Sequence, residues 1–176
     1  EVARIRGEME KVKTEVGFKG DLRAFFDQVR SDKKFTPFKT PEQVVGWYAG
    51  LETTMRPQLN KMFDLVPKSR FEVRRTEAFR EASASAEYVQ GTPDGSRPGI
   101  FYVPVPDATK HNVVGGEALF LHEAIPGHHY QISLQQEDTL LPVFRRFLWY
   151  GAYGEGWALY TESLGKELGL YTDPYQ

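Results

Sequence analysis

The chain has 176 residues, of which 40% are hydrophobic and 14% aromatic, which is enough apolar material for one domain with a hydrophobic core. Lys and Arg number 22, Asp and Glu number 24, and the two signs are mixed along the chain, which argues against nucleic-acid binding through a basic face. The absence of cysteine excludes disulfides and a thiolate zinc site, and no apolar run approaches the ~20 residues of a membrane span.

Residues 1–67 are predicted to be helical. Apolar side chains recur at three- and four-residue steps through the first helix, which Gly17 ends. The third helix opens at Thr40, a capping residue followed by Pro41 at the first helical position. Pro57 is expected to kink this helix. The expected helices cover residues 1–16, 21–30 and 41–66.

Residues 68–113 are predicted to form strands and loops, because the apolar pattern alternates there. The expected strands are Phe71–Arg75, Ala86–Gln90 and Ile100–Val103. The segment Gly91–Gly99 is dense in turn-forming residues and should be an exposed connection. Pro104 and Pro106 are expected to end the last strand or to confine it to a sheet edge.

Residues 114–170 are predicted to form the pair of helices that carries the site. The first helix starts near Val114 and continues past Pro126 to Gln136. The second covers Leu140–Leu168, with an interruption around Gly151–Gly154. With the preceding strands, these helices predict an α+β, mainly α-helical fold in one domain over residues 1–176.

Three of the four histidines lie in the segment His122-Glu123-Ala124-Ile125-Pro126-Gly127-His128-His129. Imidazole nitrogens and carboxylate oxygens are ligands that zinc accepts, and Glu123 offers a general base directly beside a ligand. A purely structural cluster would bring several polar groups together without a partner, which costs free energy. The segment therefore predicts a site for one Zn²⁺ ion, although nitrogen and oxygen ligands also admit cobalt, manganese or iron.

The histidine spacing departs from the H-E-x-x-H pattern, in which two ligands four residues apart share one helix face. In an unbroken helix, His128 and His129 would lie ~9 to ~10.5 Å beyond His122 along the axis. Pro126 lacks an N–H and Gly127 permits unusual dihedrals, so a kink or bulge is expected between the histidines. Such a bulge restores the pattern and makes His128 the preferred second ligand. His129 is the alternative second ligand, or a residue that binds substrate or supports a ligand.

A catalytic zinc site commonly has three protein ligands and one open position, so a third ligand is expected elsewhere in the chain. Glu155 is the best candidate. Glu155 and Glu162 are seven residues apart, which is two helical turns, so both face one side of the predicted helix. Glu155 is expected to bind the metal. Glu162 is expected to orient a histidine ring by accepting a hydrogen bond from the ring nitrogen that does not bind the metal. Tyr160 is a further candidate for supporting the site or contacting substrate.

The strings His122–Gln131 and Glu155–Tyr160 resemble the signature of a bacterial domain-of-unknown-function family, DUF885, related to the gluzincin zinc metallopeptidases. Weaker similarity at Gly99–Val103 and Gly169–Pro174 extends the resemblance over most of the chain. The resemblance implies a gluzincin-like core, in which a small sheet packs on an active-site helix and a glutamate helix follows. Within that core, the segment Ile100–Val103 resembles the edge strand that binds the substrate backbone by strand addition.

Carried onto this sequence, the resemblance also implies His122 and His128 as ligands, Glu123 as the base and Glu155 as the third ligand. The spacing of Glu155 and Glu162 resembles the ligand helix of thimet oligopeptidase and related carboxypeptidases. The implied protein is a zinc metallopeptidase that cleaves the peptide bonds of short peptides with a glutamate-activated, zinc-bound water.

Two other functions remain open at this stage. One is a zinc hydrolase that acts on a non-peptide amide or ester, and the other is a non-catalytic helical interaction module or degenerate peptidase. A peptide substrate is expected, and neither nucleic acid nor a membrane span is expected for this segment. Substrate sequence and length, exo- or endopeptidase cleavage, the oxyanion donor, oligomeric state and cellular location are not specified by these residues.

The chain begins at Glu1 without a methionine and ends at Gln176 just after a predicted helix. We therefore expect it to be a piece of a longer protein that binds metal but turns over substrate poorly by itself. The aromatic side chains near the predicted third ligand are expected to pack in the core. They are Trp149, Tyr150, Tyr153, Trp157 and Tyr160.

Overall fold

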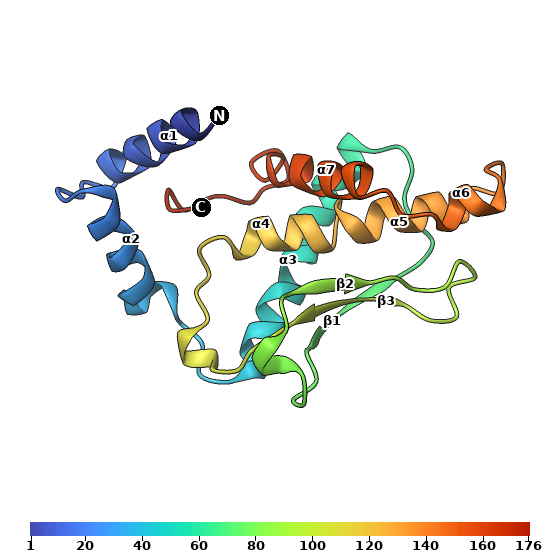
Figure 1. The fold of residues 1–176 in the computed structure, drawn as a ribbon, viewed down its shortest axis with the longest axis horizontal. Helices are drawn as coiled ribbons and strands as arrows, with labels where there is room; N and C mark the ends of the chain where they lie inside the picture. The colour runs from blue at the N-terminus through green and yellow to red at the C-terminus, as the bar shows by residue number, and fades with distance from the viewer.

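The computed structural model describes residues 1–176 (Figure 1). Its long helix α3 packs against a small three-stranded sheet and against helix α4, which is followed closely by α5. About half of the chain is helical, so the α+β prediction is confirmed. The helices are α1 Val2–Glu15, α2 Leu22–Ser31, α3 Pro41–Met62, α4 Gly116–Glu123, α5 His128–Glu137, α6 Val143–Phe147 and α7 Gly151–Glu162, and the strands are β1 Phe71–Arg75, β2 Glu87–Val89 and β3 Gly99–Val103. Short 3₁₀ helices cover Lys33–Phe35, Glu81–Ser83 and Ala108–Lys110. No helix combines the length and the apolar character that crossing a membrane requires.

Helices α1 and α2 form an arm at one end of the molecule, away from the sheet (Figure 1). Helix α1 buries none of its side chains, and α2 buries only Phe25. Asp21 caps α2 by accepting a hydrogen bond from the Ala24 backbone N–H at 2.8 Å, as expected of an N-cap aspartate. The first two predicted helices are therefore confirmed, although they contribute little to the core.

Helix α3 begins where the sequence predicts, at a capping box formed by Thr40 and Gln43. It continues through Pro57 and ends at Met62, four residues short of the predicted end at Val66. Its buried side chains recur every three or four residues and face β1 and α4; they are Val44, Tyr48, Leu51, Met55 and Leu59. This apolar stripe forms much of the core around which the site is built.

The three strands lie in the order β1-β3-β2, with β1 parallel and β2 antiparallel to β3. Strand β3 is therefore central and mostly buried, and the prediction that Ile100–Val103 is an edge strand is wrong. Pro104 and Pro106 follow the last paired residue, Val103, so neither ring occupies a position where an N–H must pair. The two edge strands are β1 and β2; Phe71 of β1 packs on Phe120 of α4 and on His129 of α5, and Tyr88 of β2 contacts His129.

The predicted helix through Pro126 is two helices. Helix α4 ends at Glu123 and α5 begins at His128, and the four residues between them are not helical. Ala124 has φ −102° and ψ −101°, and Gly127 has φ −73° and ψ −132°, both far from helical values. The peptide bond between Ile125 and Pro126 is cis. The sequence predicts a kink or bulge at Pro126-Gly127, and the structure has a complete break between two helices there. Pro126 has no N–H and so cannot donate the next helical hydrogen bond.

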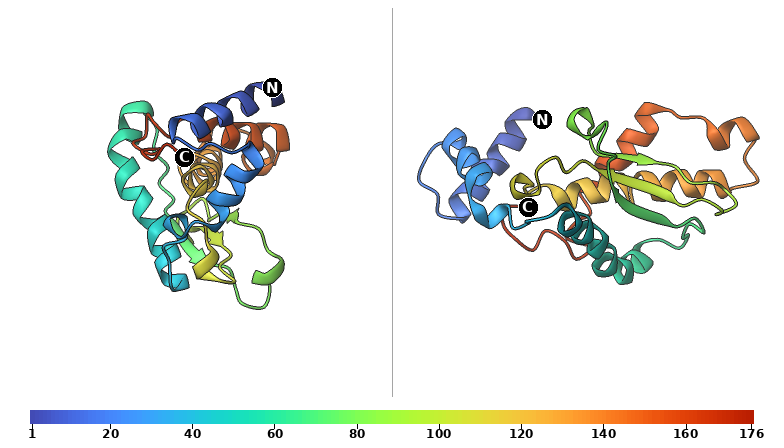
Figure 2. Two further views of the ribbon diagram at one scale, coloured as in Figure 1. Left: turned by 90° about the vertical axis from the view of Figure 1, so that its left-hand side faces the viewer. Right: turned by 90° about the horizontal axis from the view of Figure 1, so that it is seen from below.

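Helices α4 and α5 lie between α7 on one side and the sheet on the other (Figures 1 and 2). The predicted second helix, Leu140–Leu168, is divided into α6 and α7, and the interruption precedes Gly151 instead of covering Gly151–Gly154. Helix α7 starts there because the Tyr150 carbonyl accepts hydrogen bonds from the N–H groups of Tyr153 and Gly154. After Glu162 the chain turns back toward α4.

Candidate metal centre

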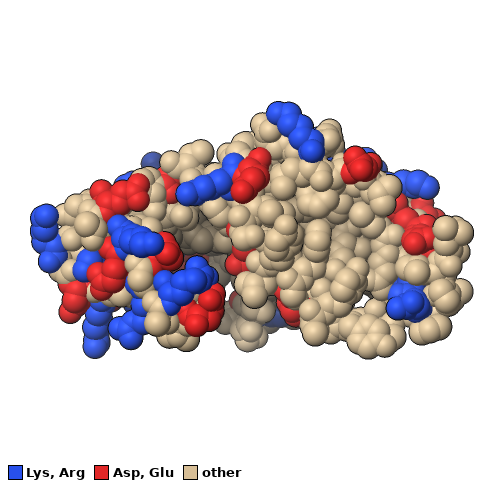
Figure 3. Space-filling model, turned by 90° about the horizontal axis from the view of Figure 1, so that it is seen from above, with Lys and Arg blue, Asp and Glu red and all other residues tan.

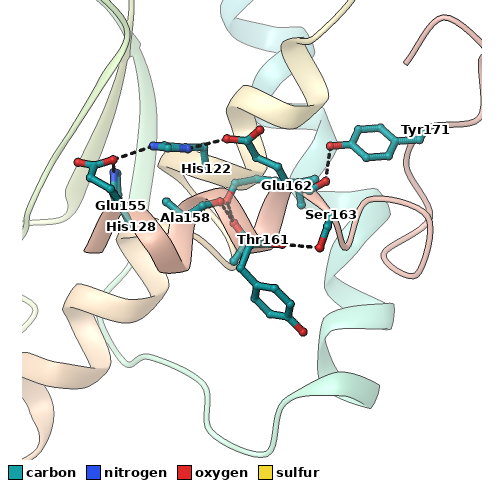
Figure 4. Close-up of polar contacts among 10 residues, drawn as sticks. His122, His128, Glu155, Ala158, Thr161, Glu162, Ser163 and Tyr171 are labelled. Atoms are coloured by element: carbon teal, nitrogen blue, oxygen red, sulfur yellow. Dashed lines mark hydrogen bonds and ion pairs between the residues drawn. The ribbon is translucent and has the colours of Figure 1, made fainter. Parts of the chain in front are cut away.

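Three side chains from three helices converge at the break between α4 and α5 (Figure 4). His122 lies in the last turn of α4, His128 is the first residue of α5, and Glu155 lies in α7. The Oε2 atom of Glu155 is 3.3 Å from Nε2 of His122 and 3.6 Å from Nε2 of His128. One nitrogen or oxygen atom from each residue lies within 4.8 Å of the other two.

The break makes this convergence possible because Gly127 approaches the end of α4 very closely. A Cβ atom at Gly127 would lie 1.9 Å from the carbonyl oxygen of His122 and 2.2 Å from that of Leu121. These contacts involve backbone atoms, which cannot move aside as a flexible side chain could. Only glycine therefore fits at residue 127, and its small size brings His128 back beside His122.

Helix α7 docks onto the break through two hydrogen bonds. The break deprives the Leu121 carbonyl of its helical partner, and the hydroxyl of Thr161 donates to it at 2.9 Å. The indole N–H of Trp157 donates to the Pro126 carbonyl at 2.7 Å. These bonds hold α7 against the broken segment, and they place its two glutamates beside the histidines.

Glu162 orients the His122 ring. Its Oε1 atom is 2.8 Å from Nδ1 of His122, so Nδ1 donates and Nε2 faces Glu155 (Figure 4). The backbone carbonyl of Glu162 accepts a hydrogen bond from the Tyr171 hydroxyl at 2.7 Å, which anchors the end of α7. The structure thus places Glu162 behind a histidine, as the seven-residue spacing predicts, and this is the arrangement of a carboxylate that holds a metal-binding imidazole.

His128 is buried, and its Nδ1 atom has no hydrogen-bond partner. Burial lowers the pKa of His128, as does the neighbouring His122. Its ring packs edge-on against His122, with centroids 4.7 Å apart, and against Trp149, with centroids 5.4 Å apart. A neutral imidazole offers a lone pair for a metal, whereas a protonated one does not.

Glu123 is the last residue of α4 and is buried beside His122. Burial raises the pKa of Glu123 to about 7, while the His122 ring and the Tyr88 backbone lower it and the Glu155 charge raises it. The Tyr88 backbone that contributes to this shift belongs to strand β2. A buried carboxyl group at the edge of a potential metal site is placed to exchange a proton there.

The three converging residues fit a zinc ion. Two imidazoles and a carboxylate are a ligand set that zinc accepts, and ligand atoms ~2.0–2.2 Å from a tetrahedral ion lie ~3.3–3.6 Å apart. The separations of 3.3 and 3.6 Å match that geometry. They would also suit ion pairs with protonated histidines, but burial of His128 disfavours its charged form. The side chain of Glu155 is 57% exposed, so one side of the site is open to solvent.

His129 does not join this group. It faces the sheet, where Nδ1 lies 2.9 Å from the Tyr88 hydroxyl and the ring packs on Phe71 with centroids 4.9 Å apart. Burial lowers the pKa of His129 to about 4. Successive residues of a helix point ~100° apart, so His128 and His129 cannot face the same side, and here His128 contacts α7 while His129 contacts the sheet. The structure therefore offers no support for His129 as the alternative second ligand.

Tyr160 also lies away from the three converging residues. Its side chain is mostly exposed, its hydroxyl makes no hydrogen bond, and its ring packs on Trp157 with centroids 5.8 Å apart. The prediction that the surrounding aromatic side chains pack in the core is wrong for Trp149, Tyr150, Tyr153 and Tyr160, all of which are exposed. Trp149 is the aromatic residue that the sequence interpretation missed at the site, because nothing in its spacing to His128 indicates their contact.

A groove of about 1000 Å³ contains none of the converging residues. It lies between the segment after α3 and helices α5, α6 and α7, and Leu65, Tyr150 and Tyr153 are among its lining residues. Cavity size alone would point away from His122, His128 and Glu155. We place the candidate site at these residues because their chemistry, and not the volume of the groove, specifies a ligand.

Comparison with known proteins gives a family match and similarity to solved structures. A family model described as "Bacterial protein of unknown function (DUF885)" matches residues 1–176. A solved structure described as "the putative lipoprotein from Colwellia psychrerythraea" has 32% sequence identity and a TM-score of 0.93. That match covers 99% of this chain and 31% of the other, so this chain spans less than a third of that relative. No curated protein matches.

Proposed function

The chain belongs to the DUF885 family of bacterial proteins of unknown function, and we propose that it is a zinc-dependent hydrolase that cleaves the peptide bonds of short peptides. One observation carries the proposal: nitrogen and oxygen atoms of His122, His128 and Glu155 converge within 4.8 Å, and the residue that follows His122 is the buried Glu123. The family assigns no activity, so the proposal rests on the chemistry of these residues.

In this proposal His122, His128 and Glu155 hold one zinc ion, and Glu162 keeps the His122 ring in place. When bound, such an ion polarises a carbonyl group and lowers the pKa of water from 15.7 toward ~7. Glu123 accepts the proton of the attacking water and then delivers it to the leaving nitrogen. The exposed side of Glu155 leaves room for a substrate to approach.

Strand β2 favours a peptide over other amides as the substrate. It pairs with β3 on one side only, so its other edge has no strand partner. The hydrogen bond between the Tyr88 hydroxyl and His129 Nδ1 ties β2 to α5, and the Tyr88 backbone partly offsets the rise that burial causes in the pKa of Glu123. A free strand edge beside the general base suits an extended peptide backbone, as in gluzincin peptidases.

Metal analysis and one substitution test the proposal. The purified chain is expected to bind one zinc ion, to lose it on His122→Ala or His128→Ala, and to retain it on His111→Asn, which changes a histidine outside the site. Glu123→Gln is expected to keep the zinc while reducing kcat/KM on internally quenched short peptides by about 10²–10⁴-fold, the usual share of a general acid or base. Glu167→Gln, an exposed glutamate after α7, is the matched control.

The same measurements separate the two alternatives. A non-peptide hydrolase would bind zinc and respond to Glu123→Gln, but it would turn over aryl esters or non-peptide amides and leave the peptides intact. A non-catalytic module would bind no stoichiometric zinc, and Glu123→Gln would not change its behaviour. Either result would overturn the peptidase proposal.

A further inference from the structure

Trp149 is a half-exposed aromatic residue at the edge of the candidate metal centre. It lies in the connection between α6 and α7, and 48% of its surface is exposed. Its ring contacts the His128 ring edge-on, with centroids 5.4 Å apart at 71°. Trp149 is thus in direct contact with a proposed zinc ligand while presenting an apolar face to solvent.

Gly154 fixes the position of this ring. A Cβ atom at Gly154 would lie 2.0 Å from the nearest atom of the Trp149 indole, so the indole occupies the space that any larger residue would fill. Gly154 directly precedes Glu155. The Trp149 ring therefore packs between Gly154, which precedes the proposed ligand Glu155, and the ring of the proposed ligand His128.

The backbone on both sides of Trp149 is also held in place. Gln135 donates hydrogen bonds from Nε2 to the carbonyls of Arg145, at 2.6 Å, and Leu148, at 3.2 Å. The Tyr150 carbonyl accepts from the N–H groups at the start of α7. An aromatic ring held on both sides loses little conformational entropy when a ligand packs on it.

The surface around this ring carries few charges. Charged side chains crowd the α1–α2 arm, whereas the surface over α7 is mostly uncharged (Figure 3). Leu148, Tyr150 and Tyr153 are exposed in the same segment, but all three line the groove, and neither tyrosine ring packs on His128. Of the exposed aromatic residues in this segment, Trp149 is the one that contacts a proposed ligand.

We propose that the exposed face of Trp149 binds an aromatic or large apolar side chain of the substrate, next to the bond that is cleaved. This inference rests on the proposed function and deepens it, because it names the substrate class as peptides with such a side chain at the reacting position. An aromatic ring packed on the indole gains both buried apolar area and a ring–ring contact.

Binding of small hydroxamates tests this proposal without relying on turnover. The zinc-loaded chain is titrated with L-phenylalanine hydroxamate and L-alanine hydroxamate by calorimetry. We expect the phenylalanine compound to bind about tenfold more tightly, from the energy of one aromatic contact. Trp149→Ala is expected to bring the ratio close to one without changing zinc stoichiometry, and Tyr153→Ala, which changes an exposed aromatic side chain of the groove, is expected to preserve it.

Trp149→Phe keeps an aromatic ring and is expected to retain most of the preference for L-phenylalanine hydroxamate over L-alanine hydroxamate. This variant provides a test even if Trp149→Ala fails to fold. Equal binding of the two hydroxamates to the zinc-loaded wild-type chain, or an unchanged ratio in Trp149→Ala, would overturn this inference and leave the proposed function intact. Absence of stoichiometric zinc in the wild-type chain would overturn both.

Discussion

Two of the buried groups of polar side chains in this molecule differ in whether their hydrogen-bonding capacity is used. In the first, the Glu81 carboxylate accepts hydrogen bonds from Nε of Arg75 at 2.8 Å, from Nη2 of Arg75 at 2.7 Å and from the Val105 N–H at 2.7 Å. The hydrogen bonds from Arg75 hold the pKa of Glu81 below its usual value. This group ties a 3₁₀ helix to β1 and to the segment after β3.

The second group is the candidate metal centre, where part of the hydrogen-bonding capacity of the side chains is unused. Nε2 of His122 and Nε2 of His128 face one carboxylate oxygen, Nδ1 of His128 has no partner, and burial raises the pKa of Glu123 to about 7 with no cation paired to it. Leaving buried polar groups partly unsatisfied costs free energy that the fold does not recover. The comparison indicates that the Glu81 group serves the fold, while the histidine group retains unused capacity that the proposed zinc ion would take up.

Zinc is expected to have the largest effect, and only on the second group. At a free zinc concentration a thousandfold above the dissociation constant, the free energy of unfolding should rise by about 4 kcal/mol, because zinc binds the folded chain and not the unfolded one. Chemical denaturation with and without a chelator measures this difference. His128→Ala should abolish it, and an equal zinc effect in that variant would refute the assignment of the site.

Gly127→Ala is expected to have the next largest effect. The added Cβ would meet backbone oxygens at 1.9 and 2.2 Å, so the break must open, at a cost of about 3 kcal/mol in unfolding free energy. Zinc binding should be lost with it. Gly156→Ala, in the open part of α7, is the matched control and should raise stability by about 0.5–1 kcal/mol, since nothing lies within 4 Å of the new methyl group.

Glu162→Ala sharpens the comparison within the metal centre. Loss of the carboxylate behind His122 should weaken zinc binding by about 10–100-fold, which is the usual effect of removing a group that orients a ligand. Competition with a fluorescent zinc chelator measures the affinity. Glu167→Ala should leave the affinity unchanged, and an equal loss in both variants would show that Glu162 does not act through His122.

Glu81→Gln tests the first group and should lower the unfolding free energy by about 1.5–3 kcal/mol, because the buried Glu81 carboxylate loses its charge-assisted pair with the Arg75 guanidinium. Glu72→Gln removes the exposed pair with Arg74 on the same strand and should cost less than about 1 kcal/mol. Neither variant should change zinc stoichiometry. A loss of zinc in Glu81→Gln would mean that the two groups are coupled.

The smallest effect is expected from acid pH. The pKa of Glu81 is lowered in the folded chain, so its contribution to stability is complete above the unfolded value of 4.5 and is lost as pH falls through the folded value. Denaturation midpoints of the zinc-free chain between pH 6 and pH 3 should therefore decline less steeply in Glu81→Gln than in the wild type. Parallel declines would show that the carboxylate is not responsible.

Much of the local structure follows from residue spacing. The Thr40-Pro41 cap places the start of α3, the Pro-Gly step places the break, and the seven-residue interval places Glu155 and Glu162 on one face of α7. Each is a short-range steric or periodic effect that acts within one or two helical turns. The extent of the break was not predictable, because it depends on hydrogen bonds that Thr161 and Trp157 supply from another helix.

The sequence by itself determined which residue types could form a metal site and that a regular helix could not contain His122 and His128 on one face. Tertiary structure alone decided that His128 faces Glu155 while His129 faces Tyr88, that β3 is central, and that Trp149 borders the site. The physical reason is that backbone geometry is governed by neighbouring residues, whereas the direction and exposure of a side chain depend on what the rest of the chain packs against it.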